Sequence, residues 1–286
     1  MRTRIDAALT TALRRAEEGA PPGLASAVRY AVFPGGARIR PHLCLAVSEA
    51  CGGDAPGLAE GVACGIELLH CASLVHDDLP CFDDADLRRG KPSVHRAFGE
   101  SLAVLAGDAL IVLAFETLAR SSSVAPERLA ALVTMLARAV GTPNGLVAGQ
   151  AWESESSVNL DAYHTAKTGS LFMAATMAGA LAAGRDPAPW RTMGQKLGAG
   201  YQVADDLMDA LARPEEAGKP TRQDVALGRP NAALSLGVDG AIAKLRGLVS
   251  EAADSVPDCP GAGPLRTLVL RMAERLVPAE LRQTAA

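Results

Sequence analysis

Apolar residues recur every three or four positions along most of the chain, which is the spacing of one face of an α-helix. Proline and glycine mark several helix ends, because proline lacks a backbone N–H; Pro34 and Gly35 end one helix, and Pro80 breaks or kinks another. Alternating runs of Val, Ile, Thr and Tyr are few, so strands are not expected. We predict helices over residues 3–18, 21–40, 41–51, 57–79, 100–120, 125–140, 160–183, 188–212 and 231–254.

The composition supports an all-α fold. Hydrophobic residues make up 49% of the 286 positions and aromatic residues only 3%, so Ala, Leu and Val must build the core. Alanine favours helix because it loses no side-chain freedom there. No change in composition marks a boundary, so we predict one domain over residues 1–286, a helical bundle around a central cavity. Residues 213–230 are polar and rich in Pro and Gly, which is typical of a loop, here beside the site.

The charge pattern excludes several classes of protein. The net charge of −4 argues against a nucleic-acid binder, which usually carries a basic face. The N-terminal residues lack the apolar segment of a signal peptide, and no uncharged apolar run reaches the roughly 18 residues of a membrane span. The six cysteines form no CxxC pair and no zinc-finger spacing. We therefore expect a cytoplasmic protein without a membrane span.

Carboxylates gather on one face of the predicted helix over 188–212. Gln202, Asp205, Asp206 and Asp209 are spaced i, i+3, i+4 and i+7 and so share a stripe. Like charges at this spacing destabilise a helix by roughly 0.2–0.5 kcal/mol per pair. A divalent cation removes that penalty, and oxygen ligands without His or Cys favour magnesium.

A second acidic segment follows the predicted helix over 57–79. It contains Asp77, Asp78, Asp83, Asp84 and Asp86, and Arg88, Arg89 and Lys91 come directly after it. A straight helix would not bring Asp77 and Asp83 together, whereas a bulged turn would. Acidic groups beside basic groups suit a metal–diphosphate complex, since carboxylates hold the cations and guanidinium groups hold phosphate oxygens.

Other kinds of acidic segment fit the sequence less well. One acidic run alone is usually a solvated surface, but here two runs each follow a long apolar helix. An EF-hand is excluded, because its spaced loop ligands and closing Glu are absent. His76-Asp77 resembles the start of a phosphohydrolase metal site, which would need further histidines at metal distance; His42, His70, His95 and His164 are the others in the chain.

Four segments together resemble the trans-isoprenyl diphosphate synthase family. The Asp77-Asp78 pair, four residues, then Asp83 and later Arg88-Arg89-Gly90 match the first aspartate-rich motif in its bacterial form. The segment with Asp205, Asp206 and Asp209 matches the second motif. GQAWE (149–153) and AKTGSLF (166–172) lie between them in the expected order, and the resemblance spans roughly residues 25–235. It implies an all-α bundle around one cavity, usually a homodimer.

The resemblance also implies roles for individual residues. Three magnesium ions per site would be held by Asp77, Asp78, Asp83, Asp205, Asp206 and Asp209, of which Asp77, Asp83 and Asp205 are the principal ligands. The allylic diphosphate would be bound by Arg88, Lys167 and Lys219, with Thr168 and Gln202 near the reacting carbon. Isopentenyl diphosphate would be bound by Arg40, His70 and Arg89. Catalysis would depend on Asp77, Asp83, Asp205, Lys167 and Arg88, supported by Gln150 and Glu153.

The sequence departs from the family pattern at two positions of the site. Ala37 stands where the family usually has lysine in the Gly-Lys-Arg-x-Arg-Pro segment, so one cation of the isopentenyl site is missing. Arg222 stands where glycine is common in the loop that contains Lys219. Neither departure removes a metal ligand, so we expect an active enzyme.

The expected reaction joins isopentenyl diphosphate to dimethylallyl, geranyl or farnesyl diphosphate. Ala72 and Ser73, just before Asp77, would set the depth of the cavity for the product tail, and small Ala72 predicts geranylgeranyl diphosphate as the main product. A farnesyl diphosphate synthase is the alternative. A terpene cyclase is less favoured because it needs no second diphosphate site, and a non-catalytic synthase subunit because both aspartate motifs are intact.

Overall fold

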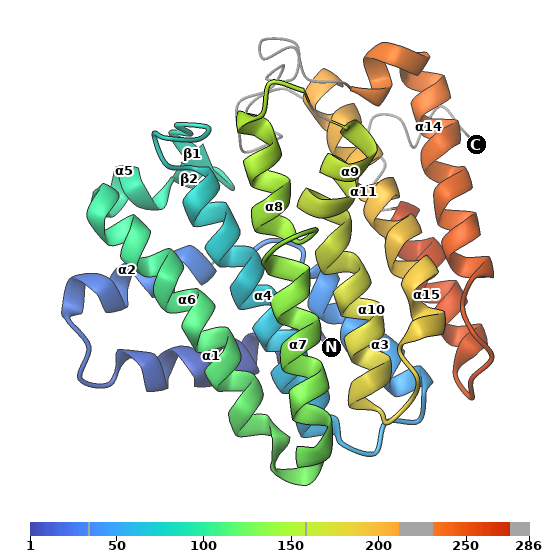
Figure 1. Ribbon diagram of the computed structural model, residues 1–286, viewed down its shortest axis with the longest axis horizontal. Coiled ribbons are helices and arrows are strands. Elements are labelled where there is room, and N and C mark those ends of the chain that lie inside the picture. Colours follow the sequence, from blue (N-terminus) through green and yellow to red (C-terminus); the bar gives the residue numbers. More distant parts are fainter. Residues whose placement is uncertain (34, 158, 212–230, 275–286) are drawn as a thin grey trace.

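The computed structural model describes residues 1–33, 35–157, 159–211 and 231–274, and these fold as an assembly of helices (Figure 1). The helices are α1 (Arg2–Glu17), α2 (Pro22–Val32), α3 (Ile39–Ala50), α4 (Pro56–Asp77), α5 (Val94–Phe98), α6 (Glu100–Ser121), α7 (Leu129–Val140), α8 (Leu146–Ala151), α9 (Leu160–His164), α10 (Ser170–Ala182), α11 (Arg191–Leu211), α14 (Ala232–Asp254) and α15 (Ala262–Glu274). A π-helical turn, Thr165–Gly169, joins α9 to α10. The prediction of an all-α fold is confirmed.

The long helices run side by side around α4, which carries the first acidic segment at its C-terminal end (Figure 1). Helix α4 packs against α6, α3 and α10, and α11 packs against α10 and α14. Small residues allow the closest of these contacts: a Cβ on Gly179 of α10 would lie 2.4 Å from the carbonyl oxygen of Cys44 on α3. The core is a continuous cluster of Ala, Leu, Val and Cys side chains, as the composition predicted.

The helix ends follow local sequence rules. Helix α2 ends at Val32, and Phe33 is extended (φ −124°, ψ 143°), because the residue before a proline avoids the helical region. Helix α3 begins at Ile39, two residues before the predicted start, and Arg38 precedes it in the left-handed conformation. The predicted helix over 160–183 is interrupted by the π-helical turn.

The sequence prediction missed short elements after the first acidic segment. Strands β1 (Leu87–Arg88) and β2 (Lys91–Pro92) pair antiparallel as a two-residue hairpin. Arg89 (φ 56°) and Gly90 (φ 74°) form its turn, since both central residues of such hairpins need positive φ. Helices α5 and α8 were not predicted, because they are too short to establish a helical period. Helix α15 was not predicted either.

Two segments are apolar and long enough to span a membrane by length and composition, namely α4 and residues Glu100–Val124. The most apolar part of α4 is 78% buried in the protein, which is the behaviour of a core helix. The corresponding part of Glu100–Val124 is only 39% buried. Helix α6 therefore has an apolar face that the described residues leave uncovered.

Candidate active site

The chain reverses direction directly after α4, and this turn places Asp83 beside Asp77. The amide N of Asp83 donates to the carbonyl O of Asp77 at 3.0 Å, and the amide N of Ala85 donates to the carbonyl O of Asp78 at 3.2 Å. Asp84 adopts positive φ (45°) within the turn, a conformation that Asp tolerates better than most residues. The turn thus brings together two carboxylates that a straight helix would separate.

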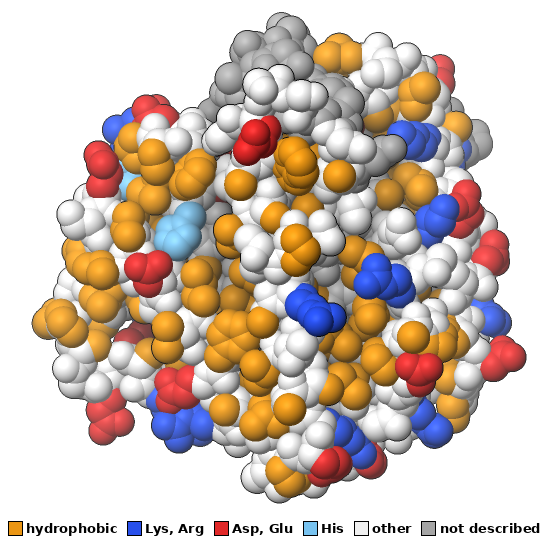
Figure 2. Space-filling model, viewed as in Figure 1, with side chains coloured by type: hydrophobic (Ala, Val, Ile, Leu, Met, Phe, Trp, Pro, Cys, Tyr) orange, Lys and Arg blue, Asp and Glu red, His pale blue; other side chains and the backbone are white. Residues whose placement is uncertain are grey.

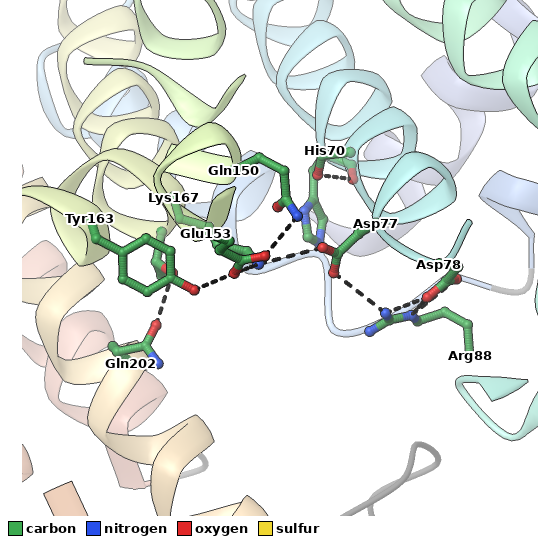
Figure 3. Close-up of polar contacts among 11 residues, drawn as sticks. His70, Asp77, Asp78, Arg88, Gln150, Glu153, Tyr163, Lys167 and Gln202 are labelled. Atoms are coloured by element: carbon green, nitrogen blue, oxygen red, sulfur yellow. Dashed lines mark hydrogen bonds and ion pairs between the residues drawn. The ribbon is translucent and has the colours of Figure 1, made fainter. Parts of the chain in front are cut away.

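Carboxylate oxygens of Asp77, Asp83 and Glu153 lie within 4.8 Å of one another, close enough to share a cation. Glu153 comes from a 3-10 turn after α8 (Figure 3). The ammonium Nζ of Lys167 lies 2.6 Å from Oε1 of Glu153 and 3.4 Å from Oδ1 of Asp77, so a positive charge already bridges this group. An all-oxygen donor set of this kind fits magnesium.

Glu153 is itself a member of the acidic group, whereas the sequence predicted only a supporting role for it. The amide of Gln150 donates to its Oε2 at 2.9 Å, and the hydroxyl of Tyr163 donates to its Oε1. Figure 3 shows Tyr163 approaching the Glu153 carboxylate from the side opposite to Asp77, whereas the ammonium of Lys167 contacts both carboxylates. Tyr163 was not predicted, since a lone tyrosine in a short polar helix gives no signal in the sequence.

The π-helical turn aims Lys167 at this acidic group. Inserting one residue into a helix shifts the side chains that follow, and such turns are frequent at functional sites. Gly149 of α8 permits the close approach: a Cβ there would lie 2.3 Å from the amide N of Lys167. The Gly-Gln and Lys-Thr-Gly segments of the sequence therefore form one packed unit.

Asp78 lies apart from the acidic group. Its side chain is buried and accepts hydrogen bonds from Arg88, with Nε to Oδ1 at 2.9 Å. Burial raises the pKa of Asp78, and the hydrogen bonds from Arg88 oppose that shift. Arg88 also approaches Asp77, with Nη2 3.7 Å from Oδ2. The structure therefore gives Asp78 an arginine partner, and its role as a metal ligand stays a prediction.

The second acidic segment lies on α11 and is connected to the Lys-Thr-Gly segment. The hydroxyl of Thr168 donates to Oε1 of Gln202 at 2.9 Å, and Nε2 of Gln202 donates to Oδ1 of Asp206 at 2.9 Å. The other oxygen of Asp206 accepts from the amide N of Ala232 at 2.8 Å, at the start of α14. Asp206 thus joins α11 to α14.

The remaining carboxylates of this segment differ in exposure. Asp205 is half-buried and Asp209 is buried, and their predicted roles as metal ligands stay predictions. Lys219 and Arg222 lie outside the described residues.

The residues predicted to bind isopentenyl diphosphate, Arg40, His70 and Arg89, lie close together between α3, α4 and the hairpin, and this group of three is named the basic pocket. Arg40 is 8% exposed and lies over the rings of Phe172 (4.6 Å) and Tyr201 (5.3 Å). Its Nη1 is 3.4 Å from Nε2 of His70, while its buried Nε has no hydrogen-bond partner among the described residues. The guanidinium of Arg89 lies beside Gly36, where a Cβ would be 3.1 Å from its Nε.

These basic groups affect one another. Burial and the positive charges of Arg40 and Arg89 lower the pKa of His70 well below its usual value, so the imidazole is neutral at pH 7. Burial likewise lowers the pKa of Arg40, although a guanidinium stays charged. A buried cation with a free donor and a neutral histidine suits an incoming anion.

The residues predicted to set product length lie on α4 below Asp77. Ala72 is 1% exposed and belongs to the core. Ser73 is half-buried, and its hydroxyl donates to the carbonyl O of His70 at 2.8 Å. Their effect on the product stays a prediction.

Comparison with known proteins agrees with this geometry. The model of the polyprenyl synthetase family matches residues 21–256, which include both acidic segments and the basic pocket. The chain belongs to the polyprenyl synthetase family. The resemblance of the sequence to the trans-isoprenyl diphosphate synthases is thereby confirmed.

Relatives within the polyprenyl synthetase family are similar over nearly their whole length. The chain is 54% identical to the geranylgeranyl diphosphate synthase of Cereibacter sphaeroides over 97% of both chains. It is 50% identical to the geranylgeranyl diphosphate synthase of Rhodobacter capsulatus, over 96% of this chain and 95% of that one. Among solved structures, a Helicobacter pylori geranyltransferase complexed with magnesium and isoprenyl diphosphate aligns with a TM-score of 0.79 at 29% identity, covering 93% and 96% of the two chains.

Proposed function

We propose that this chain is a geranylgeranyl diphosphate synthase, a magnesium-dependent prenyltransferase that joins isopentenyl diphosphate to allylic diphosphates. The observation that carries the proposal is the pairing of two sites: the carboxylates of Asp77, Asp83 and Glu153 face Lys167, and a separate basic pocket contains Arg40. A metal bound by the carboxylates would hold one diphosphate and the cations of the basic pocket another, which suits an enzyme with two diphosphate substrates. Relatives at 54% and 50% identity carry this name, which favours it over a farnesyl diphosphate synthase.

The residues around the acidic group would hold the allylic substrate. Asp77, Asp83 and Asp205 would bind the metal, which we propose as three magnesium ions. Bound magnesium neutralises the departing diphosphate and so favours ionisation of the allylic C–O bond. Lys167, Arg88 and Lys219 would bind the oxygens of the same diphosphate through charge-assisted hydrogen bonds.

The basic pocket would hold the second substrate. Arg40, His70 and Arg89 would bind the diphosphate of isopentenyl diphosphate and so direct its double bond towards the allylic carbon. The rings of Phe172 and Tyr201 exclude water around Arg40 and strengthen its attraction to an anion. The neutral imidazole of His70 can donate one hydrogen bond without adding charge.

The exposed face of α6 supports a homodimer. Val104, Leu105 and Val112 are 42%, 51% and 67% exposed. Leu105 and Val112, spaced i and i+7, lie on one stripe of the helix, and Val104 borders it. Figure 2 shows hydrophobic side chains spread over this side of the molecule. A second copy that covers the stripe would remove this apolar area from water. A cytoplasmic location stays a prediction.

Incubation with labelled isopentenyl diphosphate, farnesyl diphosphate and magnesium tests the function. We expect geranylgeranyl diphosphate as the main product and loss of turnover when EDTA removes the metal. Geranyl diphosphate converted no further than farnesyl diphosphate would favour the farnesyl synthase. Consumption of a prenyl diphosphate without isopentenyl diphosphate would indicate a cyclase, and no turnover of any substrate would indicate a non-catalytic subunit.

A further inference from the structure

Arg38 is a buried arginine two residues before Arg40. Its side chain is 1% exposed, and its Nη1 donates to Oε1 of Glu67, itself 2% exposed, at 2.6 Å. The Nη2 donates to the carbonyl O of Val32 at 2.8 Å, and Nε donates to Oδ1 of Asp6 at 3.3 Å. Burying an ion pair costs desolvation, so such a pair is weak evidence for stability alone. Its other role is to fix the elements that it joins.

Gly35 lies directly against this guanidinium. A Cβ on Gly35 would lie 2.0 Å from Cζ of Arg38, so its backbone runs against the planar group. Arg38 itself has φ 53° and ψ 37° and precedes the first residue of α3. This left-handed conformation is uncommon for a residue with a side chain, so surrounding contacts must hold it. The hydrogen bonds of the Arg38 side chain to Glu67, Val32 and Asp6 are contacts of this kind.

The pair joins the two elements that carry the basic pocket. Glu67 lies three residues before His70, one turn away on the same side of α4. Arg40 is the second residue of α3, two residues after Arg38, and its Nη1 lies 3.4 Å from Nε2 of His70. Next to Gly35, Gly36 lies against the guanidinium of Arg89. The Arg38–Glu67 pair therefore sets the separation of the groups that would contact the second diphosphate.

We propose that Arg38, through its buried pair with Glu67, is a positioning residue for the isopentenyl diphosphate site. It holds residues 35–37 and the start of α3 against α4, so that Arg40 and His70 converge. Arg38 does not touch the substrate. The inference rests on the proposed function of the basic pocket.

The test replaces the whole pair by apolar residues, in the double variant Arg38→Met/Glu67→Leu. Such a replacement leaves no buried unpaired charge, so the protein is expected to stay folded. The KM for isopentenyl diphosphate should rise about tenfold or more, because small displacements of binding groups cost large factors. The KM for farnesyl diphosphate should change less than about twofold, since Lys167 and Asp77 are not displaced.

The matched control is Arg29→Met/Glu17→Leu. This pair joins the last turn of α2 to the end of α1, with Nε of Arg29 2.6 Å from Oε1 of Glu17. Among the described residues, neither side chain makes a hydrogen bond or an ion pair with residues 35–37 or with α4. Both KM values should stay at the wild-type level. The control separates a general loosening of the first helices from a specific effect on the pocket.

A folded double variant with a wild-type KM for isopentenyl diphosphate would overturn the proposal, as would equal increases in both KM values. If the double variant does not fold, Glu67→Ala gives the decision, because it removes the link to α4 while Asp6 and the carbonyl O of Val32 still partner Arg38. An unchanged KM for isopentenyl diphosphate in this variant then rejects the positioning role. A wild-type protein that never condenses isopentenyl diphosphate would instead refute the proposed function, and would do so before any variant is made.

Discussion

At the scale of single residues, burial decides how the basic groups behave. Arg40 is held between two aromatic rings and His70, and its buried Nε is left without a hydrogen-bond partner among the described residues. A buried donor without a partner costs free energy, roughly 1–3 kcal/mol. Binding of an anion removes that cost. Relief of this cost at Arg40 would contribute to the free energy of binding the second diphosphate.

The neutral state of His70 predicts a pH-dependent stability. Its pKa is lowered well below 6.5 in the folded protein, so the unfolded chain binds the proton more readily. Stability is therefore full above about pH 6.5 and falls as the pH drops below that value. His70→Gln should reduce the loss of unfolding free energy between about pH 7.5 and 5.5, measured by urea denaturation. An identical loss in both proteins would contradict the neutral state of His70.

The acidic group predicts different effects for two of its members. Asp77→Ala should lower kcat by about 10³-fold or more, with the unfolding free energy changed by no more than about 1 kcal/mol. Glu153→Gln keeps the shape and should raise the magnesium concentration needed for half-maximal rate by about tenfold or more. The exposed Glu155 offers a control two residues away, and Glu155→Gln should leave both quantities unchanged. Full activity of Asp77→Ala would refute the assignment.

Ala37 predicts a gain of binding. This exposed residue follows Gly36, which lies against Arg89, so a lysine there adds a cation at the rim of the basic pocket. Ala37→Lys should lower the KM for isopentenyl diphosphate by about threefold to tenfold, because one more charge-assisted hydrogen bond becomes available. The KM for farnesyl diphosphate serves as the internal reference and should not change. A higher KM for isopentenyl diphosphate would indicate that this substrate binds elsewhere.

At the scale of elements, α4 combines two tasks. Most of its length is core, and its C-terminal end presents Asp77 to the acidic group. The basic pocket uses His70, two turns earlier on the same helix. A rigid core helix therefore fixes the relative position of both proposed substrate sites, which a flexible loop would not do.

The same helix predicts the length of the product. Ala72→Tyr fills space about one turn below Asp77 and should shift the main product from geranylgeranyl to farnesyl diphosphate, measured by chromatography of labelled products. Ala72→Val is the graded control and should give a mixture. Because Ala72 is 1% exposed, overpacking will also cost about 1–3 kcal/mol of stability, so both variants are assayed well below their Tm. A folded Ala72→Tyr variant that still makes geranylgeranyl diphosphate would contradict this floor.

At the scale of the whole molecule, the uncovered face of α6 predicts the assembly. Val112 is 67% exposed on the apolar stripe of this helix, and burying an apolar side chain contributes about 1.5–3 kcal/mol. Val112→Glu should therefore convert the proposed dimer into monomers at micromolar concentration, measured by sedimentation velocity. Val124 is 69% exposed in the 3-10 turn that follows α6, and Val124→Glu should leave the dimer intact. A monomeric wild-type protein would reject the homodimer.

The features that the sequence predicted correctly depend on interactions between residues close together in the chain. The end of α2 before Pro34 follows from the restriction that proline places on Phe33. The helices follow from apolar periodicity, and the carboxylates of α11 share a face because of their spacing. The motifs from Asp77 to Asp209 were enough to indicate the family, which the comparisons confirmed. These features depend on residues within a few turns of one another.

Only the tertiary structure decided which groups meet. Glu153 and Tyr163 join Asp77 because α8 packs on a π-helical turn, and no sequence period reveals that extra residue in the helix. The pairing of Arg38 with Glu67 likewise depends on how α3 docks on α4. Contacts between distant segments are set by packing, which the local pattern of apolar and polar residues does not specify. The sequence therefore determined most of the long helices and the kind of chemistry at the site, and packing decided the partners of each residue.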